Sequence, residues 1–308
     1  MKGSAAAGTA SSGHLYEPVA GILLVLGSGF LFSISDTLSK VLTHTLPVFE
    51  IAWLRFLAFV LMVVPVIVVQ GRASLRTSRP ALQILRGLGV TGSSILFNFG
   101  VVSLPLADAT VIGFASPLFI TALSIPLLGE KVGIRRWSAV VVGLVGILVV
   151  ARPGAATFDP AAIFPLLSSM SWSVGMIFTR KLSASDPAPA IMAYSAVTGF
   201  VVLSALLPFV WVAPSLTDIA LGLCVGIAST ASHWVLIAAY RRADASLLAP
   251  FSYVQIVWAS VLGFLFFSAL PGPATLTGGA IIAASGLYTA HRERAAARRL
   301  NASKKGGS

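Results

Sequence analysis

The chain has 308 residues, of which 56% are hydrophobic and only 10% charged, with a formal net charge of +11. A soluble domain normally has about 25% charged residues, so this composition excludes an ordinary water-soluble fold and favours a protein surrounded by lipid. The basic residues lie in short clusters between apolar runs, which argues against a nucleic-acid partner, and the single cysteine, Cys224, excludes an intramolecular disulfide or a cysteine-cluster metal site.

Apolar runs long enough to cross a bilayer follow one another along the chain. A transmembrane helix needs about 20 mostly apolar residues, and breakers such as Pro47, Gly71 and Pro105 separate the runs. The first run is longer than the apolar part of a signal peptide, so we expect it to be retained as a span. The sequence predicts an all-α polytopic membrane protein with ten transmembrane helices, over residues 18–40, 47–69, 80–102, 107–128, 136–151, 160–181, 188–211, 218–240, 245–267 and 274–291.

The positions of Lys and Arg predict the orientation of these spans. If the N-terminus lies inside, all 21 basic residues except Lys40, Arg55 and Arg152 fall on the cytoplasmic side, as the excess of basic residues in cytoplasmic loops requires. We therefore expect a multi-pass protein of a bacterial-type inner (plasma) membrane with both termini in the cytoplasm. Residues 1–17 are expected to form a disordered tail and residues 292–308 a basic tail, disordered from residue 300 onwards.

Short motifs recur in the same order in the two halves of the chain. Each half contains an aromatic residue and a serine followed at the same spacing by a basic residue, then an alanine–aspartate–alanine motif, then a glycine-spaced apolar helix. The copies are Phe32-Ser33 to Lys40 and Trp172-Ser173 to Arg180, then Ala107-Asp108-Ala109-Thr110 and Ala243-Asp244-Ala245-Ser246, then Gly143 to Gly146 and Gly279 to Gly286. This order predicts a duplication.

The duplication predicts two repeats of opposite orientation. Residues 18–152 and 160–291 would each contain five spans, and because five is odd, the second repeat is expected to be inverted in the membrane. Asp108 would then face outward and Asp244 inward. Inverted repeats underlie many secondary transporters, because the two halves supply interchangeable gates on the two sides.

The same motifs carry a resemblance to a known family. The chain resembles the EamA-type transporters of the drug/metabolite transporter superfamily over residues 18–291. Besides the repeated motifs, the matching residues are Pro47 to Glu50, Arg55-Phe56, Pro117, Gly129-Glu130-Lys131 and Gly286-Leu287-Tyr288. The second half departs from the family pattern by lacking a Gly-Glu pair near Ala269, and the first by having Phe32 where a tryptophan is usual. The resemblance implies a central cavity lined largely by spans three, four, eight and nine, and a cargo such as an amino acid, S-adenosylmethionine or riboflavin.

Charged residues inside the apolar runs are candidates for the substrate site, because charges in a bilayer are costly and usually functional. Arg55 in the second span and Asp36 in the first could meet as an ion pair. Arg55 would then either serve packing, as a buried pair or by snorkelling outward, or receive an anionic group such as a substrate carboxylate. Asp36, Glu50 and His233 are the titratable candidates for proton coupling.

Uncharged polar residues supply further candidates for the cavity. Asn98 and the His233-Trp234 pair occupy nearly matched positions in the two repeats. On a continuous helix, Gln255 shares a face with Ser252 and Trp258. These groups would suit an aromatic or heterocyclic ligand, whereas the structural alternative is hydrogen bonding and packing between helices.

Two backbone features concern helix shape and packing. Pro117 is expected to free a backbone carbonyl and bend the fourth span. Gly222 and Gly226 form a short GxxxG motif, which permits close helix packing.

No catalytic motif is present, since the chain has no G-x-S-x-G, H-E-x-x-H or Walker sequence. We therefore expect no enzymatic activity, no cofactor and no metal. The leading hypothesis is a secondary active transporter that moves a small polar or amphipathic metabolite by alternating access. The alternatives are an efflux carrier of the same fold, an intramembrane hydrolase and a non-transporting membrane adaptor. The expected partners are a small-molecule substrate and the lipid bilayer, with a homodimer left open.

Overall fold

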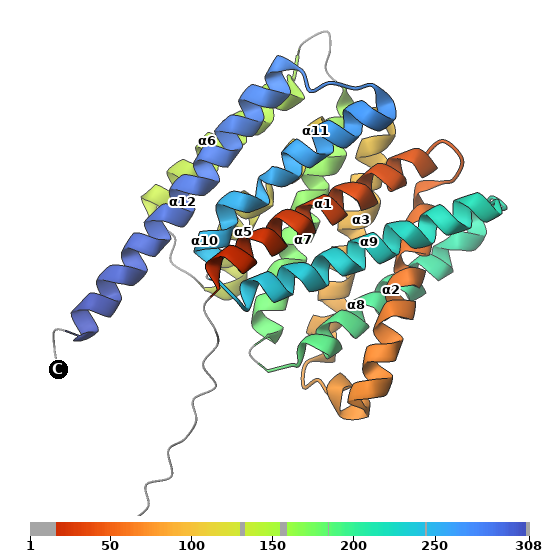
Figure 1. Cartoon of the computed structure of the whole chain (residues 1–308), viewed down its shortest axis with the longest axis horizontal. Helices are drawn as coiled ribbons and strands as arrows, with labels where there is room; N and C mark the ends of the chain where they lie inside the picture. The colour runs from red at the N-terminus through yellow and green to blue at the C-terminus, as the bar shows by residue number, and fades with distance from the viewer. Residues whose placement is uncertain (1–16, 130–132, 155–158, 184, 244, 306–308) are drawn as a thin grey trace, which may run out of the picture.

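A computed structural model describes residues 17–129, 133–154, 159–183, 185–243 and 245–305. These residues form helices and connecting turns, with no strand among them (Figure 1). The α-helices are α1 (Pro18–Leu42), α2 (Val48–Gln70), α3 (Pro80–Ser103), α4 (Leu106–Gly113), α5 (Ser116–Leu128), α6 (Ile134–Ala151), α7 (Ile163–Leu182), α8 (Ala188–Leu206), α9 (Leu216–Tyr240), α10 (Ala245–Ser252), α11 (Val254–Phe267) and α12 (Pro273–Lys305). Short 3-10 helices lie at Arg72–Leu75, Pro160–Ala162 and Leu207–Phe209.

Eight helical segments in the described part of the chain are long and apolar enough to cross a membrane. They correspond to α1, α2, α3, α4 with α5, α7, α8, α9, and α10 with α11. Two predicted spans remain: residues Trp137–Ala151 form a shorter apolar helix within α6, and α12 begins at Pro273. The protein is an all-helical, multi-pass membrane protein, while the count of ten spans and the inversion of the halves stay predictions.

Two of the predicted spans are interrupted near their middle. The fourth predicted span divides into α4 and α5 at Phe114 and Ala115. Pro117 has no N–H to donate to the carbonyl of Gly113, which is consistent with an interruption at this point. The bend expected there stays a prediction. The ninth predicted span divides at Tyr253, between α10 and α11. Two corresponding segments of the predicted repeats are therefore interrupted as α-helices, although Ala115 and Tyr253 keep right-handed helical dihedral angles.

The C-terminal end differs from expectation. α12 continues to Lys305, so the prediction of disorder is wrong for residues 300–305. Residues 292–299, which precede this stretch, are rich in alanine and arginine, and both are strong helix formers. Residues 1–16 and 306–308 lie outside the described residues, as do the Glu130-Lys131 pair and Asp244 of the predicted motifs.

The helices pack in long antiparallel pairs around a common centre. α1 lies along α9, α3 lies along α7, and α2 contacts both α8 and α9. α6 and α12 pair with each other at one edge of the bundle (Figure 1). Their backbones approach closely, since a Cβ placed on Gly146 would lie 2.9 Å from the carbonyl oxygen of Gly278. This arrangement leaves α1, α2, α3, α7 and α9 to surround the interior.

Polar contacts join the connecting segments at one end of the bundle. Asp186, between α7 and α8, accepts hydrogen bonds from the Thr77 hydroxyl, from the Gln83 amide at 2.7 Å and from the Ser185 hydroxyl at 2.9 Å. Burial tends to raise the pKa of Asp186, but these hydrogen bonds outweigh it and hold the pKa below its usual range. The ionised carboxylate thus ties the α7–α8 connection to the beginning of α3.

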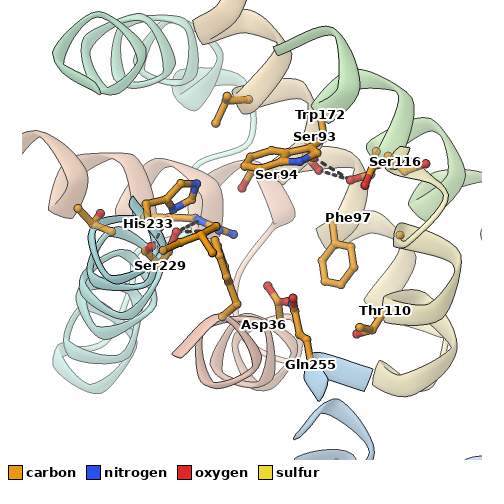
Figure 2. A pocket seen from close by; sticks show the side chains of 18 of the residues that line it. Asp36, Ser93, Ser94, Phe97, Thr110, Ser116, Trp172, Ser229, His233 and Gln255 are labelled. Atoms are coloured by element: carbon orange, nitrogen blue, oxygen red, sulfur yellow. Dashed lines mark hydrogen bonds between the residues drawn. The ribbon is translucent and has the colours of Figure 1, made fainter. Parts of the chain in front are cut away.

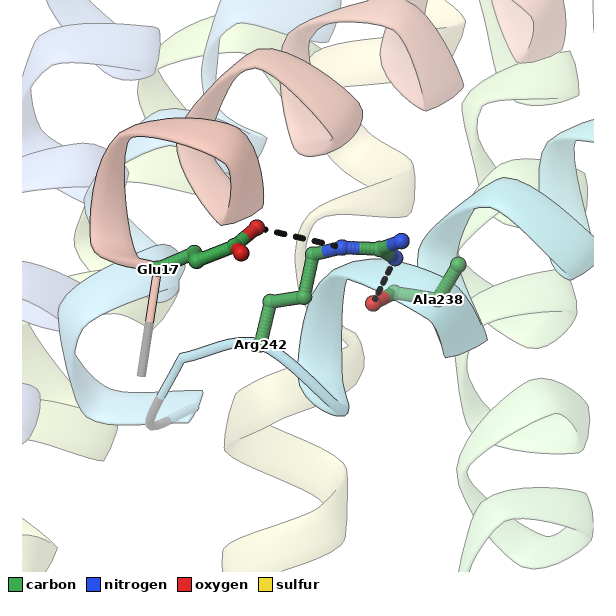
Figure 3. A network of polar contacts seen from close by, with 3 residues as sticks. All are labelled: Glu17, Ala238 and Arg242. Atoms are coloured by element: carbon green, nitrogen blue, oxygen red, sulfur yellow. Dashed lines mark hydrogen bonds and ion pairs between the residues drawn. The ribbon is translucent and has the colours of Figure 1, made fainter. Parts of the chain in front are cut away.

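The beginning of α1 is attached to the end of α9 at this same end. The Nε of Arg242 lies 3.9 Å from a carboxylate oxygen of Glu17, and its Nη1 donates to the carbonyl of Ala238 at 3.1 Å (Figure 3). The backbone N–H of Glu17 also donates to the carbonyl of Arg242 at 3.0 Å. Both side chains are largely exposed, so the ion pair contributes little stability and mainly orients the chain.

Candidate functional site

A cavity of about 270 Å³ lies at the centre of the bundle. Its walls come from α1, α2, α3, α7 and α9 and from the interrupted segments α4–α5 and α10–α11. In Figure 2, Asp36 and Gln255 lie on one side of the cavity, His233 and Ser229 on a second, and Trp172 on a third. Charged, amide, imidazole and aromatic groups from distant parts of the chain therefore face one partly open cavity, as in small-molecule sites.

Opposite charges line the cavity without bonding directly to each other. Arg55 donates from Nε at 3.1 Å and from Nη2 at 2.8 Å to the hydroxyl oxygen of Ser229. Asp36 is 8% exposed, and within the described residues it has no hydrogen bond and no close ion pair, although its charge interacts electrostatically with Arg55. The ion pair considered for Asp36 and Arg55 is therefore not formed among the described residues, and the two side chains instead line the same cavity.

His233 belongs to the same wall as Ser229. Its Nδ1 lies 2.8 Å from the backbone carbonyl of Ser229, and because a carbonyl can only accept, Nδ1 carries the proton in this contact. The imidazole also packs edge-on to Phe32, with ring centroids 4.8 Å apart, and lies 5.7 Å from Trp172. In the neutral ring Nε2 is left as an acceptor.

Serine hydroxyls cover the wall formed by α3 and α7. The Ser168 hydroxyl donates to the carbonyl of Ser93 at 2.8 Å and lies 3.0 Å from the Ser93 hydroxyl. The Ser173 hydroxyl reaches the carbonyl of Ser116, at the start of α5, at 2.9 Å. These small side chains let α3 and α7 approach closely and give the cavity a hydrogen-bonding surface.

The interrupted helices contribute directly to the cavity. Gly113, Phe114 and Ser116 line it from the α4–α5 junction, and Gln255 lines it from the first turn of α11. An interruption of the helical hydrogen bonds at membrane depth is tolerated where it is buried in protein or faces a water-filled cavity. Broken helices at the midplane are also a recurring feature of substrate sites in secondary transporters.

A lysine links α1 to α3 one turn beyond Asp36. The ammonium of Lys40 donates to the carbonyl oxygens of Val101 at 2.6 Å and Leu104 at 2.7 Å. In a continuous helix the Val101 carbonyl would accept from the residue four positions on, but that residue is Pro105, which has no N–H. Lys40 therefore satisfies a carbonyl that the helix leaves without a partner.

Comparison with known families matches the chain twice. Residues 19–152 and residues 159–290 each match the EamA-like transporter family. The chain belongs to this family. As an EamA-like protein, it is a transporter that resides in a membrane.

Curated relatives of this EamA-like chain extend over most of its length. It is 30% identical to an S-adenosylmethionine uptake transporter of Rickettsia bellii, over 86% of this chain and 91% of the relative. It is 28% identical to a riboflavin transporter of Vibrio cholerae, over 92% of this chain and 97% of the relative. It is also 28% identical to a pseudopaline exporter of Pseudomonas aeruginosa, over 85% of this chain and 93% of the relative.

Four of the residues expected at the site of this EamA-like protein line the cavity, namely Asp36, Arg55, His233 and Gln255. Asn98 and Glu50 are elsewhere. Both are fully buried, and neither side-chain polar atom of Asn98 has a hydrogen-bond partner among the residues that the structure describes. Glu50 accepts a hydrogen bond from the backbone N–H of Val212 at 3.2 Å, far along the chain in the connection before α9.

The other three expected residues also lie outside the cavity lining. Trp234 packs against an apolar cluster of Val63, Met192 and Ala193. The Ser252 hydroxyl donates to the carbonyl of Ala249 at 2.7 Å, and Trp258 packs edge-on to Phe30, with ring centroids 5.0 Å apart. The shared face expected for Ser252 and Gln255 assumed one continuous helix, whereas α10 ends at Ser252 and α11 begins at Val254. Trp258 belongs to the same helix as Gln255, but its ring packs on Phe30 of α1 and does not line the cavity.

The aromatic residues that line the cavity were not predicted from the sequence, because only polar residues were considered as candidates. Phe32 and Trp172 both line the cavity, yet in the sequence they served only as markers of the repeat. The signal was their shared context, since each is followed by a serine and then, at the same spacing, by a basic residue. Lys40, which bonds α1 to α3, is the basic residue that follows Phe32-Ser33 in this repeated context.

Proposed function

We propose that this EamA-like protein is a secondary transporter that moves a small polar or amphipathic metabolite across the inner (plasma) membrane by alternating access. The observation that carries the proposal is the central cavity, in which Asp36, Arg55 and His233 face one space between interrupted helices. Charged groups at membrane depth are costly unless they serve a substrate or ion pathway. Without a nucleotide site, the driving force would come from an ion or substrate gradient.

The relatives and the cavity together support a metabolite cargo. The names of the relatives cover S-adenosylmethionine, riboflavin and pseudopaline, moved inward in one case and outward in another. The aromatic rings of Phe32 and Trp172 suit a planar ring, and the charges suit polar groups. Asp36 and His233 line the cavity and are the better candidates for proton coupling, whereas Glu50 lies away from it.

The proposed topology has ten spans, both termini in the cytoplasm and the second half inverted. The basic residues support this orientation, and the interruption of corresponding segments in both halves supports the duplication. In a Cys224→Ser background, single cysteines at positions 108 and 244 are expected to react with a membrane-impermeant maleimide from opposite sides. Labelling of both from the same side would disprove the inversion.

Transport is tested by flux into proteoliposomes containing the purified full-length protein. S-adenosylmethionine, amino acids and riboflavin are offered separately, with and without a proton gradient. We expect saturable flux of at least one compound, reduced about 10-fold or more in Arg55→Gln, which removes a charge-assisted hydrogen bond. Arg76→Gln is the matched control, because Arg76 is exposed in the α2–α3 connection.

Two outcomes of the flux experiment would contradict the proposal. Chemical conversion of a compound without its movement would indicate an intramembrane hydrolase. Absence of flux for all compounds, together with capture of a membrane partner, would indicate an adaptor. Preloading the vesicles on one side and then the other separates import from export.

A further inference from the structure

Arg55 and Asp36 both have hydrogen-bonding capacity that the described residues do not use. A guanidinium has five N–H donors, and the two hydrogen bonds from Arg55 to Ser229 use Nε and Nη2. Nη1 therefore remains available at the end of the guanidinium. The Asp36 carboxylate lines the same cavity and accepts no hydrogen bond from the described residues. The cavity thus offers one unused cationic donor and one unused anionic acceptor.

A ligand with a single charge would leave one of these two groups without a partner. A buried charge is stable only when it is paired and hydrogen-bonded, and truncating one partner of a buried pair is strongly unfavourable. A neutral ring would leave both groups unpartnered. A ligand that carries an ammonium and a carboxylate close together would satisfy both at once.

The fixed position of Arg55 favours a carboxylate as its partner. Ser229 holds the guanidinium through two hydrogen bonds, and the backbone of Ser229 is itself bonded to His233 at 2.8 Å. A planar guanidinium recognises carboxylates with defined geometry, unlike the point charge of lysine. Holding it in advance reduces the entropy that binding has to remove.

The remainder of the cavity is suited to the rest of such a ligand. Trp172, Phe97 and Phe114 provide aromatic surfaces, while Gln255 and the serines of α3 and α7 provide hydrogen bonds. An aromatic or heterocyclic side group can pack on these rings.

Resting on the transport function proposed above, we infer that the cavity takes the zwitterionic head group of an α-amino acid, with its ammonium on Asp36 and its carboxylate on Arg55. The ring of the ligand lies among the aromatic residues. A flavin, which has no such head group, is a poor ligand. Arg55 and Asp36 are specificity-determining residues, because one binds the carboxylate and the other the ammonium of the same head group.

The test compares probes that keep the head group with probes that lack part or all of it, using binding and flux of the full chain. S-adenosylmethionine has the complete head group and decarboxylated S-adenosylmethionine lacks only the carboxylate. In 5′-methylthioadenosine the whole head group is absent, together with its carbon chain and the sulfonium charge. L-phenylalanine and phenethylamine form a second pair that differs by the carboxylate. Wild-type protein is expected to bind at least one complete head group about 10-fold or more tightly than its truncated partners.

The variants assign each charge to its residue. In Arg55→Gln the preference for the carboxylate-containing probe is expected to disappear, while in Asp36→Asn overall binding weakens and that preference remains. Arg55→Lys keeps the charge without the planar donors and is expected to retain only part of the preference. If Arg55→Gln fails to fold, Arg55→Lys decides the assignment.

Several outcomes would overturn the inference. Equal binding of complete and truncated probes by the wild type would do so, as would an unchanged carboxylate preference in Arg55→Gln and Arg55→Lys. Flux of riboflavin with none of the amino-acid probes would leave the transport function standing and remove only the head-group assignment. Absence of flux for every probe would count against the transport function itself.

Discussion

Replacing Gly226 with alanine is expected to destabilise the protein by about 3 kcal/mol or more, because the new methyl group has no room. A Cβ at Gly226 would lie 2.4 Å from the backbone oxygen of Arg55 and 2.4 Å from the Cβ of Ala58. Neither atom can move without shifting α2. The readout is the temperature at which the purified protein loses its monodisperse state in detergent, which should fall well below that of the wild type.

Two other glycines provide matched controls for this substitution. Gly222→Ala adds the same methyl group one turn earlier, where it meets Leu54 at 2.4 Å from Cδ1 and 2.7 Å from Cβ and has no backbone atom among its nearest neighbours, so a smaller loss is expected. Gly27→Ala adds it to α1 with nothing within 4 Å and should be neutral or slightly stabilising, as alanine favours helix. Equal effects at Gly222 and Gly226 would contradict the packing described between α2 and α9.

The effect of Gly226 also reaches the cavity. Ser229 lies almost one turn further along α9 and holds the guanidinium of Arg55. A shift of α2 away from α9 would therefore weaken the same contacts that orient Arg55. Ligand binding by Gly226→Ala should fall even in the fraction of protein that stays folded, whereas Gly222→Ala should keep it.

Hydropathy predicted the helical segments well, because a membrane-spanning helix is determined by the composition of about 20 consecutive residues. The interruption at Phe114 could also be anticipated from Pro117. The interruption at Tyr253 was not predicted, because the segment over residues 245–267 was treated as one continuous helix. The break separates Ser252 from Gln255, whereas the position of Trp258 against Phe30 is a result of tertiary packing.

The cavity could be predicted only in part. Asp36, Arg55 and His233 stood out because charged and imidazole groups are rare in apolar spans. Asn98 looked equally polar yet is fully buried outside the cavity, since which face of a span meets the cavity depends on tertiary packing. Apolar residues give no such signal in a protein that is apolar everywhere, so the role of Phe97 could not be read from the sequence.

Replacing Lys40 with methionine is expected to open the bundle at the end where α1 finishes. Methionine fills a similar length but cannot donate to the carbonyls of Val101 and Leu104, which Lys40 bonds at 2.6 and 2.7 Å. A buried carbonyl without a partner costs about 1–3 kcal/mol. In Lys40→Met the closed conformation of this structure would be destabilised by that free energy relative to an open conformation, in which water reaches the two carbonyls. Since 1.4 kcal/mol corresponds to a factor of ten, the open population should rise by roughly 10-fold or more.

Accessibility of the cavity measures this shift. In a Cys224→Ser background, a cysteine at Ser94, which lines the cavity from α3, should react about 10-fold faster with an impermeant maleimide added on the side of the α1–α2 connection. Lys40→Arg retains donors for both carbonyls and should stay close to the wild-type rate. A cysteine at Leu236, which lines the cavity from the last part of α9, reports from the opposite side and should react more slowly in Lys40→Met. Faster labelling from both sides would mean general loosening, and unchanged labelling at Ser94 would mean that Lys40 does not hold this end of the bundle closed.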